Sequence, residues 1–322
     1  MNDYRITLKL RSALGSLLQS DTLFGHLCWQ VAFGRWSGGG IDDFLEPFRR
    51  GEPPFVLSDG FPAGVLPKPL AWRAPRFDVL NAEVYAQTKR VGKSRFVTET
   101  DFQRICRGEN PVESFLQNAY QTVEFLHAKL DRITHFTSGE GDLFQTEDIV
   151  PLRRVRVKDE SWESRETDQI VIYARCQPGW IEIIEQLLKE TARCGYGRDK
   201  SVGLGAFQVA SVEPFNGFAK PPGANAFVTL SSYVPATDDP QDGCYRLRTK
   251  YGKLSEIVES GNPFKRPILQ IEPGACFFTG GEPKPWYGTL VEKIAPGKPE
   301  AVQCCYTLAV AAVFPKRMAD SA

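Results

Sequence analysis

The first residues of the chain alternate between apolar and polar side chains. Apolar residues occupy positions 4, 6, 8 and 10, with polar residues between them. This period of two is typical of a strand with one buried face. After a loop at 12–20, apolar residues recur at helical spacing from Asp21 to Gly34, and Ser20 or Asp21 can cap the first turn. The pattern therefore predicts a strand followed by a helix.

A second cycle of the same kind begins near residue 168. The β-branched run 169–176 predicts a strand, the amphipathic stretch 180–193 predicts a helix, and segments 206–212, 227–233 and 304–314 predict further strands. Two cycles of strand, helix and strands predict an α+β fold of two ferredoxin-like (RRM-like) domains. We place these domains at residues 1–160 and 161–322.

Composition is that of an ordinary globular protein. The chain has 322 residues, of which 42% are hydrophobic and 24% charged, and it is long enough for two domains. The eight cysteines include no CxxC pair and the three histidines are scattered, so we expect no metal site and no cofactor. The N-terminus enters a strand pattern without a signal-peptide core, and no apolar run is long enough to span a bilayer. We therefore expect a cytoplasmic location.

The distribution of charge is more informative than its sum. The net charge is zero, which argues against a nucleic-acid binder. However, residues 89–98 and 151–158 each carry four cations and no acid, although such runs are as often solvated surface as binding sites. The cations of the first run are Lys89, Arg90, Lys93 and Arg95. Because this run has few apolar residues, we expect it to protrude as a loop or β-hairpin.

A glycine-rich segment follows the second predicted helix. Residues 195–205 read GYGRDKSVGLG, two Gly-x-Gly units around a spacer that holds Arg198 and Lys200. Glycine allows a close approach of the backbone to a ligand, and free N–H groups with nearby cations suit phosphate oxygens. The segment is not a Walker loop, because Gly203 is followed by Leu204 where that motif requires a Lys-Ser/Thr pair. It is not a dinucleotide fingerprint either, because it follows a helix instead of opening one. A phosphate-binding loop and a simple turn remain the two interpretations.

This loop resembles the signature of the RAMP superfamily of CRISPR-associated proteins, in which two Gly-hydrophobic-Gly units flank a basic spacer. Three further blocks resemble the family of the fourth subunit of type III-A Csm effector complexes. They are SDTLFGHLCW at 20–29, LSDGFP with LPKP between 57 and 69, and LDRIT with GDLF between 130 and 144. The blocks occur in the family's order and lie between residues 1 and 210.

The resemblance implies a subunit that binds the repeat-derived 5′ handle of a crRNA in an antiviral ribonucleoprotein. It implies contacts with the large polymerase-like subunit and the backbone RAMP subunit, no membrane contact, and a β-hairpin thumb that presses on the RNA. We place the thumb at the basic run 89–95, with Tyr85 and Phe96 nearby, where cations would hold phosphates and an aromatic ring could wedge beside a base. The residues expected to bind RNA are Gly195, Gly197, Arg198, Lys200, Ser201, Gly203, Gly205, Ser20, Asp21, Thr22, Lys89, Arg90, Lys93, Arg95, Arg132 and Thr134.

An enzymatic alternative rests on His26. Some RAMP proteins cut the guide precursor with a histidine near the first helix, but acid–base cleavage of RNA needs both a donor and an acceptor. No second histidine or paired acid stands near His26 in the sequence, and a partly exposed helix position or a partner contact explains it. His127 and His135 are weaker candidates and are interpreted as RNA contacts. We therefore expect a non-catalytic subunit, with an endoribonuclease that uses His26 as the alternative.

Changing Arg198 and Lys200 together to alanine is expected to weaken RNA retention. If each cation holds one phosphate, the slope of log affinity against log salt should fall by up to about two units, at roughly 0.7–0.9 per contact. Binding to a single-stranded RNA across a salt series measures this slope. An unchanged slope and affinity would remove both residues from the interface.

Overall fold

The computed structural model describes residues 1–72, 89, 91–111, 115–129, 133, 134, 136, 143–156, 162–254 and 262–315. The predicted first cycle is present as strand β1 (Asn2–Leu10) and helix α1 (Ser20–Ala32). The second cycle is present as β9 (Gln169–Cys176), α5 (Trp180–Cys194) and β10 (Phe207–Pro214). Within the described residues, no helix combines the length and apolar character needed to cross a membrane.

The first sheet has the strand order of a ferredoxin-like fold. Its main path is β10-β1-β9-β2, where β2 spans Phe55–Leu57, and the short β3 (Phe61–Pro62) also pairs with β9. All of these pairings are antiparallel, so numbering the four strands of the path in chain order gives the arrangement 4-1-3-2. Helix α1 connects β1 towards β2, and α5 connects β9 to β10, which makes two split β-α-β units.

A large insertion separates the two halves of this unit. Between β3 and β9 the chain forms two short strands, a helix and a three-stranded sheet. These elements are β4 (Val65–Pro67), β5 (Phe96–Thr98), α4 (Glu99–Cys106), β6 (Tyr120–Ala128), β7 (Leu143–Arg156) and β8 (Trp162–Glu166). A boundary at residue 160 therefore falls inside the first unit, because β1 lies before it and pairs with β9 and β10, which both lie after it.

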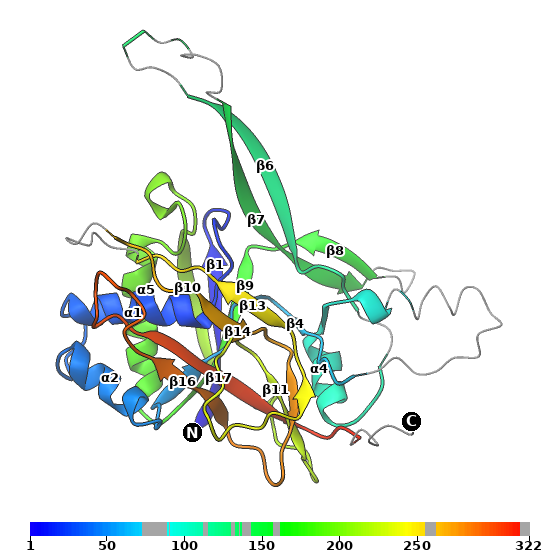
Figure 1. Cartoon of the computed structure of the whole chain (residues 1–322). Helices are drawn as coiled ribbons and strands as arrows, with labels where there is room; N and C mark the ends of the chain where they lie inside the picture. Colours follow the sequence, from blue (N-terminus) through cyan, green and yellow to red (C-terminus); the bar gives the residue numbers. More distant parts are fainter. Residues whose placement is uncertain are drawn as a thin grey trace.

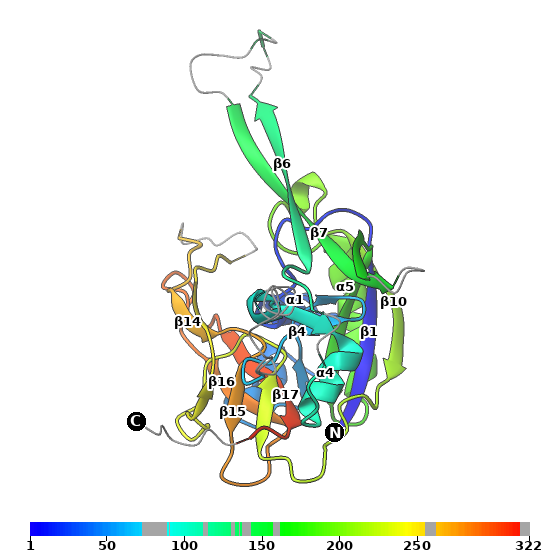
Figure 2. The same ribbon diagram turned by 90° about the vertical axis from the view of Figure 1, so that its right-hand side faces the viewer.

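The second sheet comes entirely from the C-terminal part of the chain. Its order is β12-β15-β11-β17-β16, with a separate β13-β14 pair beside it. The strands are β11 (Ala226–Thr229), β12 (Gly243–Cys244), β13 (Leu247–Lys250), β14 (Ile268–Ile271), β15 (Cys276–Phe278), β16 (Trp286–Val291) and β17 (Gln303–Ala312). The described residues of 226–315 contain no helix. Helix α1 instead packs against β17 as well as α5, and so lies between the two halves of the molecule (Figure 2).

The protruding hairpin is β6–β7, not the basic run at 89–95. Figure 1 shows β6 and β7 projecting far from the body, paired from Tyr120 opposite Pro151 to Ala128 opposite Leu143. The predicted thumb is wrong in position because the described part of the basic run is held against the body. Val91 is buried, and the ammonium of Lys68 donates to the carbonyls of Val91 and Gly92 at 3.0 and 3.2 Å. Arg90 and Tyr85 lie outside the described residues.

An aromatic cluster joins the helices to both sheets. Phe48 of α2 (Ile41–Arg49) is fully buried, with its ring 4.8 Å from that of Phe24 on α1 and 5.2 Å from that of Phe55 on β2. The hydroxyl of Tyr306 on β17 donates to the Phe48 carbonyl at 2.8 Å. The cluster therefore ties α2 to elements from both halves of the chain.

Phe48→Ala is expected to lower the free energy of unfolding by about 3–5 kcal/mol, because it leaves a cavity where several rings meet. Urea unfolding measures the loss. Phe264→Ala is the matched control, since that ring is 63% exposed, and it should change stability by less than about 0.5 kcal/mol. Equal effects of the two substitutions would contradict this account of the core.

Candidate nucleic-acid interface

Three segments meet at the root of the hairpin. The loop at 11–19, between β1 and α1, forms paired hydrogen bonds with β7, from Leu14 to Ile149 and back, at 3.0 and 2.8 Å. On its other side the Gly205 N–H donates to the Ala13 carbonyl at 2.8 Å. The glycine-rich loop, the 11–19 loop and the hairpin therefore form one continuous surface, which we call the hairpin root (Figure 1).

Packing explains two of the glycines in the loop. Gly197 and Gly205 have φ values of +78° and +68°, in the left-handed region that favours glycine. A Cβ at Gly205 would overlap the Tyr196 carbonyl, and one at Gly197 would overlap the hydroxyl of Ser16. These glycines therefore allow the loop to fold on itself and against the 11–19 loop.

Tyr196, between the first two glycines, holds the loop in place. It is buried, and its hydroxyl donates to the Leu17 carbonyl and accepts the Gln19 N–H, both at 2.9 Å. This role was not predicted from the sequence, although an aromatic residue between two glycines is visible there. The loop also uses its own amides: those of Tyr196, Gly197, Arg198, Val202, Gly203, Leu204 and Gly205 donate within the protein. The backbone N–H groups at these positions are therefore not free to bind phosphate.

The exposed part of the loop is its basic spacer. The Arg198 side chain is about half exposed; it pairs with Asp199 at 3.2 Å and donates to the Glu147 carbonyl of β7, also at 3.2 Å. Ser201, Val202 and Gly203 are exposed, whereas Gly195 is buried and Lys200 is half-buried. The predicted contacts at Arg198, Lys200, Ser201 and Gly203 therefore lie together on the surface beside the hairpin.

Two grooves border the hairpin root. One, of about 230 Å³, lies between Arg198 and Asp199 of the loop and residues 145–147 of β7. The other, of about 530 Å³, lies between the 11–19 loop and strands β7 and β8, and Arg11 and Arg153 are among its lining residues. Arg153 stands directly opposite Arg165 in the β7–β8 pairing. Arg165 is itself paired with Glu163 at 3.1 Å, and Glu166 and Asp168 line the same groove as Arg11 and Arg153. The larger groove therefore carries charges of both signs.

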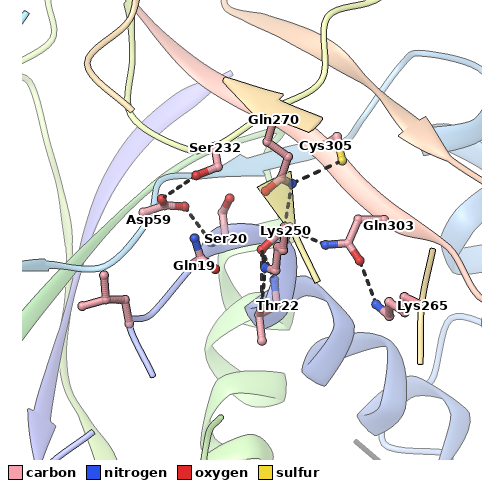
Figure 3. A network of polar contacts seen from close by, with 12 residues as sticks. Gln19, Ser20, Thr22, Asp59, Ser232, Lys250, Lys265, Gln270, Gln303 and Cys305 are labelled. Atoms are coloured by element: carbon pink, nitrogen blue, oxygen red, sulfur yellow. Dashed lines mark hydrogen bonds and ion pairs between the residues drawn. The ribbon is translucent and has the colours of Figure 1, made fainter. Parts of the chain in front are cut away.

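The start of α1 is buried in a polar network instead of facing solvent. The Asp21 carboxylate accepts from the Lys250 ammonium at 2.6 Å and from the side-chain amides of Gln270 and Gln303 at 2.9 and 2.6 Å (Figure 3). Burial alone would raise the pKa of Asp21, but Lys250 and the two amides outweigh it and lower that pKa. Thr22 accepts from the same ammonium at 2.7 Å. Of the predicted RNA contacts Ser20, Asp21 and Thr22, the first two are therefore buried. Asp21 connects α1 to β13, β14 and β17.

A second buried carboxylate lies beside this network. Asp59 accepts the backbone N–H of Ser20 at 2.8 Å and the hydroxyl of Ser232 at 3.3 Å. Burial raises the pKa of Asp59 to about 6; Asp21 adds to the effect, while the Ser20 N–H and the charges of Arg248 and Lys250 oppose it. Two acids close together thus have opposite pKa shifts, because only Asp21 has a cation in direct contact.

His26 is buried under the glycine-rich loop. Its side chain is not the partly exposed one expected from the sequence: the residue is 6% exposed, its ring lies 5.2 Å from that of Tyr196, and its Nε2 accepts the Gly197 N–H at 3.4 Å. Burial lowers the pKa of His26 to about 4, and the charges of Lys200 and Lys265 add to this. The ring is therefore neutral at pH 7 and packs as part of the loop's support.

The remaining predicted residues are dispersed. Lys89 and Lys93 are exposed beside the body, and Arg95 pairs with Glu272 at 2.9 Å. Thr134 follows β6 in the chain, and Arg132 and His135 are outside the described residues. His127 is on β6, where its Nε2 lies 2.8 Å from the Thr146 hydroxyl and its ring stacks on Phe144. The structure thus brings together the loop residues but not the basic run.

The distal hairpin is apolar on its surface. Phe125, Leu126, Leu143 and Phe144 are between 45% and 72% exposed. They stand at the end of β6 and the start of β7, where Phe125 lies opposite Thr146, Leu126 opposite Gln145, Phe144 opposite His127 and Leu143 opposite Ala128. Exposed apolar side chains on so thin a support are typical of a contact with another molecule.

Comparison with known proteins identifies the fold. No protein-family model matches the chain, and no curated protein matches its sequence. Among solved structures, a chain of a Csm1–Csm4 cassette in complex with AMPPNP matches with a TM-score of 0.59 and 18% identity, over 97% of this chain and 99% of that chain. A Csm1–Csm4 cassette with cA4 gives 0.61 and 16%, over 98% and 99%. A Csm3–Csm4 subcomplex of the type III-A CRISPR-Cas interference complex gives 0.57 and 15%, over 98% and 100%.

Csm4 is the component common to these structures. This chain has a Csm4-type fold. The expected α+β class and the resemblance to the fourth Csm subunit are confirmed at the level of the fold, over nearly the full length of both chains. The Csm4-type fold also covers the residues after 215, where the sequence resemblance is thin.

Asp59→Asn is expected to change how stability depends on pH. The carboxyl has a folded-state pKa of about 6 against an ordinary 3.8, so between these values the folded state binds more protons than the unfolded state. Stability therefore falls as pH rises through this window, by roughly 3 kcal/mol at about 1.4 kcal/mol per pKa unit. Urea unfolding from pH 4 to 7.5 should show the variant gaining stability relative to the wild type by that order.

Asp21→Asn is the contrasting control. The folded-state pKa of Asp21 is lowered, so its contribution is present above pH 3.8 and is lost only at lower pH. The cost of that substitution should vary less from about pH 5 to 7.5 than the effect of Asp59→Asn, because it changes there only through the contribution of the Asp21 charge to the pKa of Asp59. A difference between Asp59→Asn and wild type that does not vary with pH would contradict the assigned charge state of Asp59.

Proposed function

We propose that this chain is a non-catalytic subunit of a type III CRISPR effector complex that binds the repeat-derived 5′ handle of the crRNA. The observation that carries the proposal is the Csm4-type fold, matched over 97% of the chain. The proposal also draws on the hairpin root, where the glycine-rich loop, the 11–19 loop and β7 form one surface with exposed cations.

The local chemistry suits single-stranded RNA. Arg198 and Lys200 stand beside the groove between the loop and β7, and Arg11 and Arg153 line the larger groove. Cations along a groove hold phosphates without reading sequence. The apolar hairpin offers Phe125 and Phe144 for contact with base faces, and stacking on an aromatic ring is tolerant of sequence. The net charge of zero does not exclude this role, because exposed cations such as Arg198 lie on this surface.

The proposed partners follow from the structural neighbours. In those structures Csm4 is found with Csm1 or with Csm3. We infer that this chain joins a large polymerase-like subunit to a backbone RAMP subunit in the same way. Exposed apolar side chains occur outside the hairpin too, at Tyr251, Phe264 and Leu269 around β13 and β14, where a protein partner would exclude water from them.

The environment of His26 favours a structural role over catalysis. A general acid must carry a proton near neutral pH and reach the leaving oxygen. The pKa of His26 is lowered to about 4 and the side chain is covered by the glycine-rich loop. The endoribonuclease alternative would need this loop to move away, so we assign cleavage of the precursor to another component.

Affinity purification of the tagged chain from a host that carries its CRISPR locus tests the proposal. Mature guides with one common repeat-derived 5′ end are expected to copurify, together with the large and backbone subunits. A matched sample with residues 126–145 replaced by a short Asn-Gly turn should retain the fold, because the Leu14–Ile149 bonds remain, and should retain less guide RNA.

Recovery of the chain alone, or with unrelated RNA, would overturn the proposal. Recovery with precursor RNA that is converted to guides on incubation would instead support the nuclease. His26→Gln then separates the two, because conversion should stop only if His26 takes part in cleavage.

A further inference from the structure

A cavity at the base of the hairpin has features that the proposed function does not yet use. It has a volume of about 270 Å³ and lies between the 11–19 loop, the start of β6 and the ends of β13 and β14. Residues from both halves of the chain line it, among them Asp59, Tyr120 and Arg248. Its volume is below the roughly 300–1,000 Å³ of pockets for drug-sized molecules, so it suits a single ring system.

Asp59 supplies an acceptor with unused capacity. The carboxylate accepts two hydrogen bonds, from Ser20 and Ser232, whereas an ionised carboxylate has about four lone-pair sites. Burial without a cation in direct contact makes the charge costly, as the raised pKa of about 6 indicates. A buried carboxylate of this kind is stabilised by a ligand that donates N–H groups to it.

Donors without partners lie in the same region. The Nε of Arg248 is buried and makes no hydrogen bond with the described residues, and neither does the hydroxyl of Ser20. Arg248 donates through its NH2 group to Ser232 at 3.0 Å, which fixes the guanidinium close to Asp59. Unsatisfied buried polar atoms are rare in native proteins, and Arg248 is one of the residues that line this cavity.

The rim of the cavity is cationic. Arg95 and Arg246 are exposed there, and Arg95 shares its charge with Glu272. Phe96 and Tyr120 add aromatic surface to the wall, with the Tyr120 hydroxyl donating to the Gly60 carbonyl at 2.7 Å. A nucleotide matches these features: the donors on the edge of its base would meet the acceptor inside the cavity, and its planar ring would lie against the aromatic walls. Its phosphate would lie near the cations at the rim.

We propose that this cavity takes up one unstacked nucleobase of the bound RNA and that Asp59 accepts hydrogen bonds from the N–H edge of that base. The inference rests on the RNA-binding role proposed above. A basic side chain of a protein partner is the competing occupant, but the cations at the rim would repel it. The cationic rim therefore favours a nucleotide.

The chemistry of Asp59 predicts which bases are accepted. Guanine presents two adjacent N–H donors, and adenine and cytosine each present an amino group. Uracil presents one N–H between two carbonyl oxygens, which would face the carboxylate with like partial charge. Uracil is therefore the disfavoured base, by roughly 5- to 100-fold relative to a base that donates twice, the range expected for one good bidentate contact.

The experiment is a base scan with the full chain. Single-stranded RNAs that carry the repeat-derived 5′ end are made with each of the four bases at each position in turn, and dissociation constants are measured at fixed salt. One position is expected at which uridine binds most weakly and guanosine most tightly. In Asp59→Asn the preference against uridine at that position should disappear, because an amide can donate to a carbonyl as well as accept.

A second variant protects the test against misfolding. Asn118→Trp places a large ring at an exposed residue that lines the cavity, and it should remove the same preference without changing buried contacts. Asn216→Trp is the matched control at an exposed residue outside the cavity lining, and it should keep the preference. Melting curves of all three variants establish that they are folded.

The outcomes separate this proposal from the one it rests on. In one outcome the wild type binds RNA and yet shows no base preference that is removed by both Asp59→Asn and Asn118→Trp. That result overturns the base pocket and leaves the RNA-binding role standing. If wild type binds no RNA, both proposals fall. If the scan is flat and Asn118→Trp weakens binding of the large or backbone subunit, the cavity belongs to a protein partner and the nucleobase assignment is overturned.

Discussion

Helix α1 is packed between two sheets, and its buried Asp21 is bonded to residues from the far end of the chain. Lys250, Gln270 and Gln303 lie on β13, β14 and β17, and all three donate to the one carboxylate. A buried charge of this kind is stable only while its partners remain in place; loss of one partner typically costs about 3–5 kcal/mol. The network therefore fixes how the C-terminal sheet sits against α1, and with it the positions of the 11–19 loop and the cavity beside Asp59.

The ferredoxin-like unit could be predicted from the sequence because each of its elements buries one face. Apolar residues alternate with polar ones at positions 4 to 10 and recur at helical spacing in 180–193, because in each case one face of the element is buried. The hairpin could not be predicted in the same way. β6 and the distal part of β7 are exposed on both faces, so their sequence shows no regular alternation of apolar and polar residues. The thumb was therefore predicted at the basic run 89–95 instead. Val91 and the buried Lys68 hold the described part of that run in place through contacts that no local pattern encodes.

The candidate site was predicted in part. The glycine-rich loop was located correctly in the chain, and its spacer is exposed beside the hairpin. However, the reason for the glycines is the close packing of the loop on Ser16 and Tyr196, and most of its amides are already bonded. The buried acids at 21 and 59 could not be assigned from sequence, since their partners lie up to 282 positions away. Long-range pairing of this kind is a property of the fold and leaves no spacing for a motif search to find.

The insertion between β3 and β9 has a consequence for synthesis on the ribosome. β1 is completed at residue 10, but its neighbours β9 and β10 begin at residues 169 and 207. At about 5–20 residues per second, the nascent strand waits on the order of 10–30 s for its first partner, with both edges unpaired and the apolar face of α1 uncovered. During that time the emerging chain is a substrate for chaperones and for premature pairing with its neighbours on a polysome. A protein built in this way depends on the timing of its translation as well as on its final contacts.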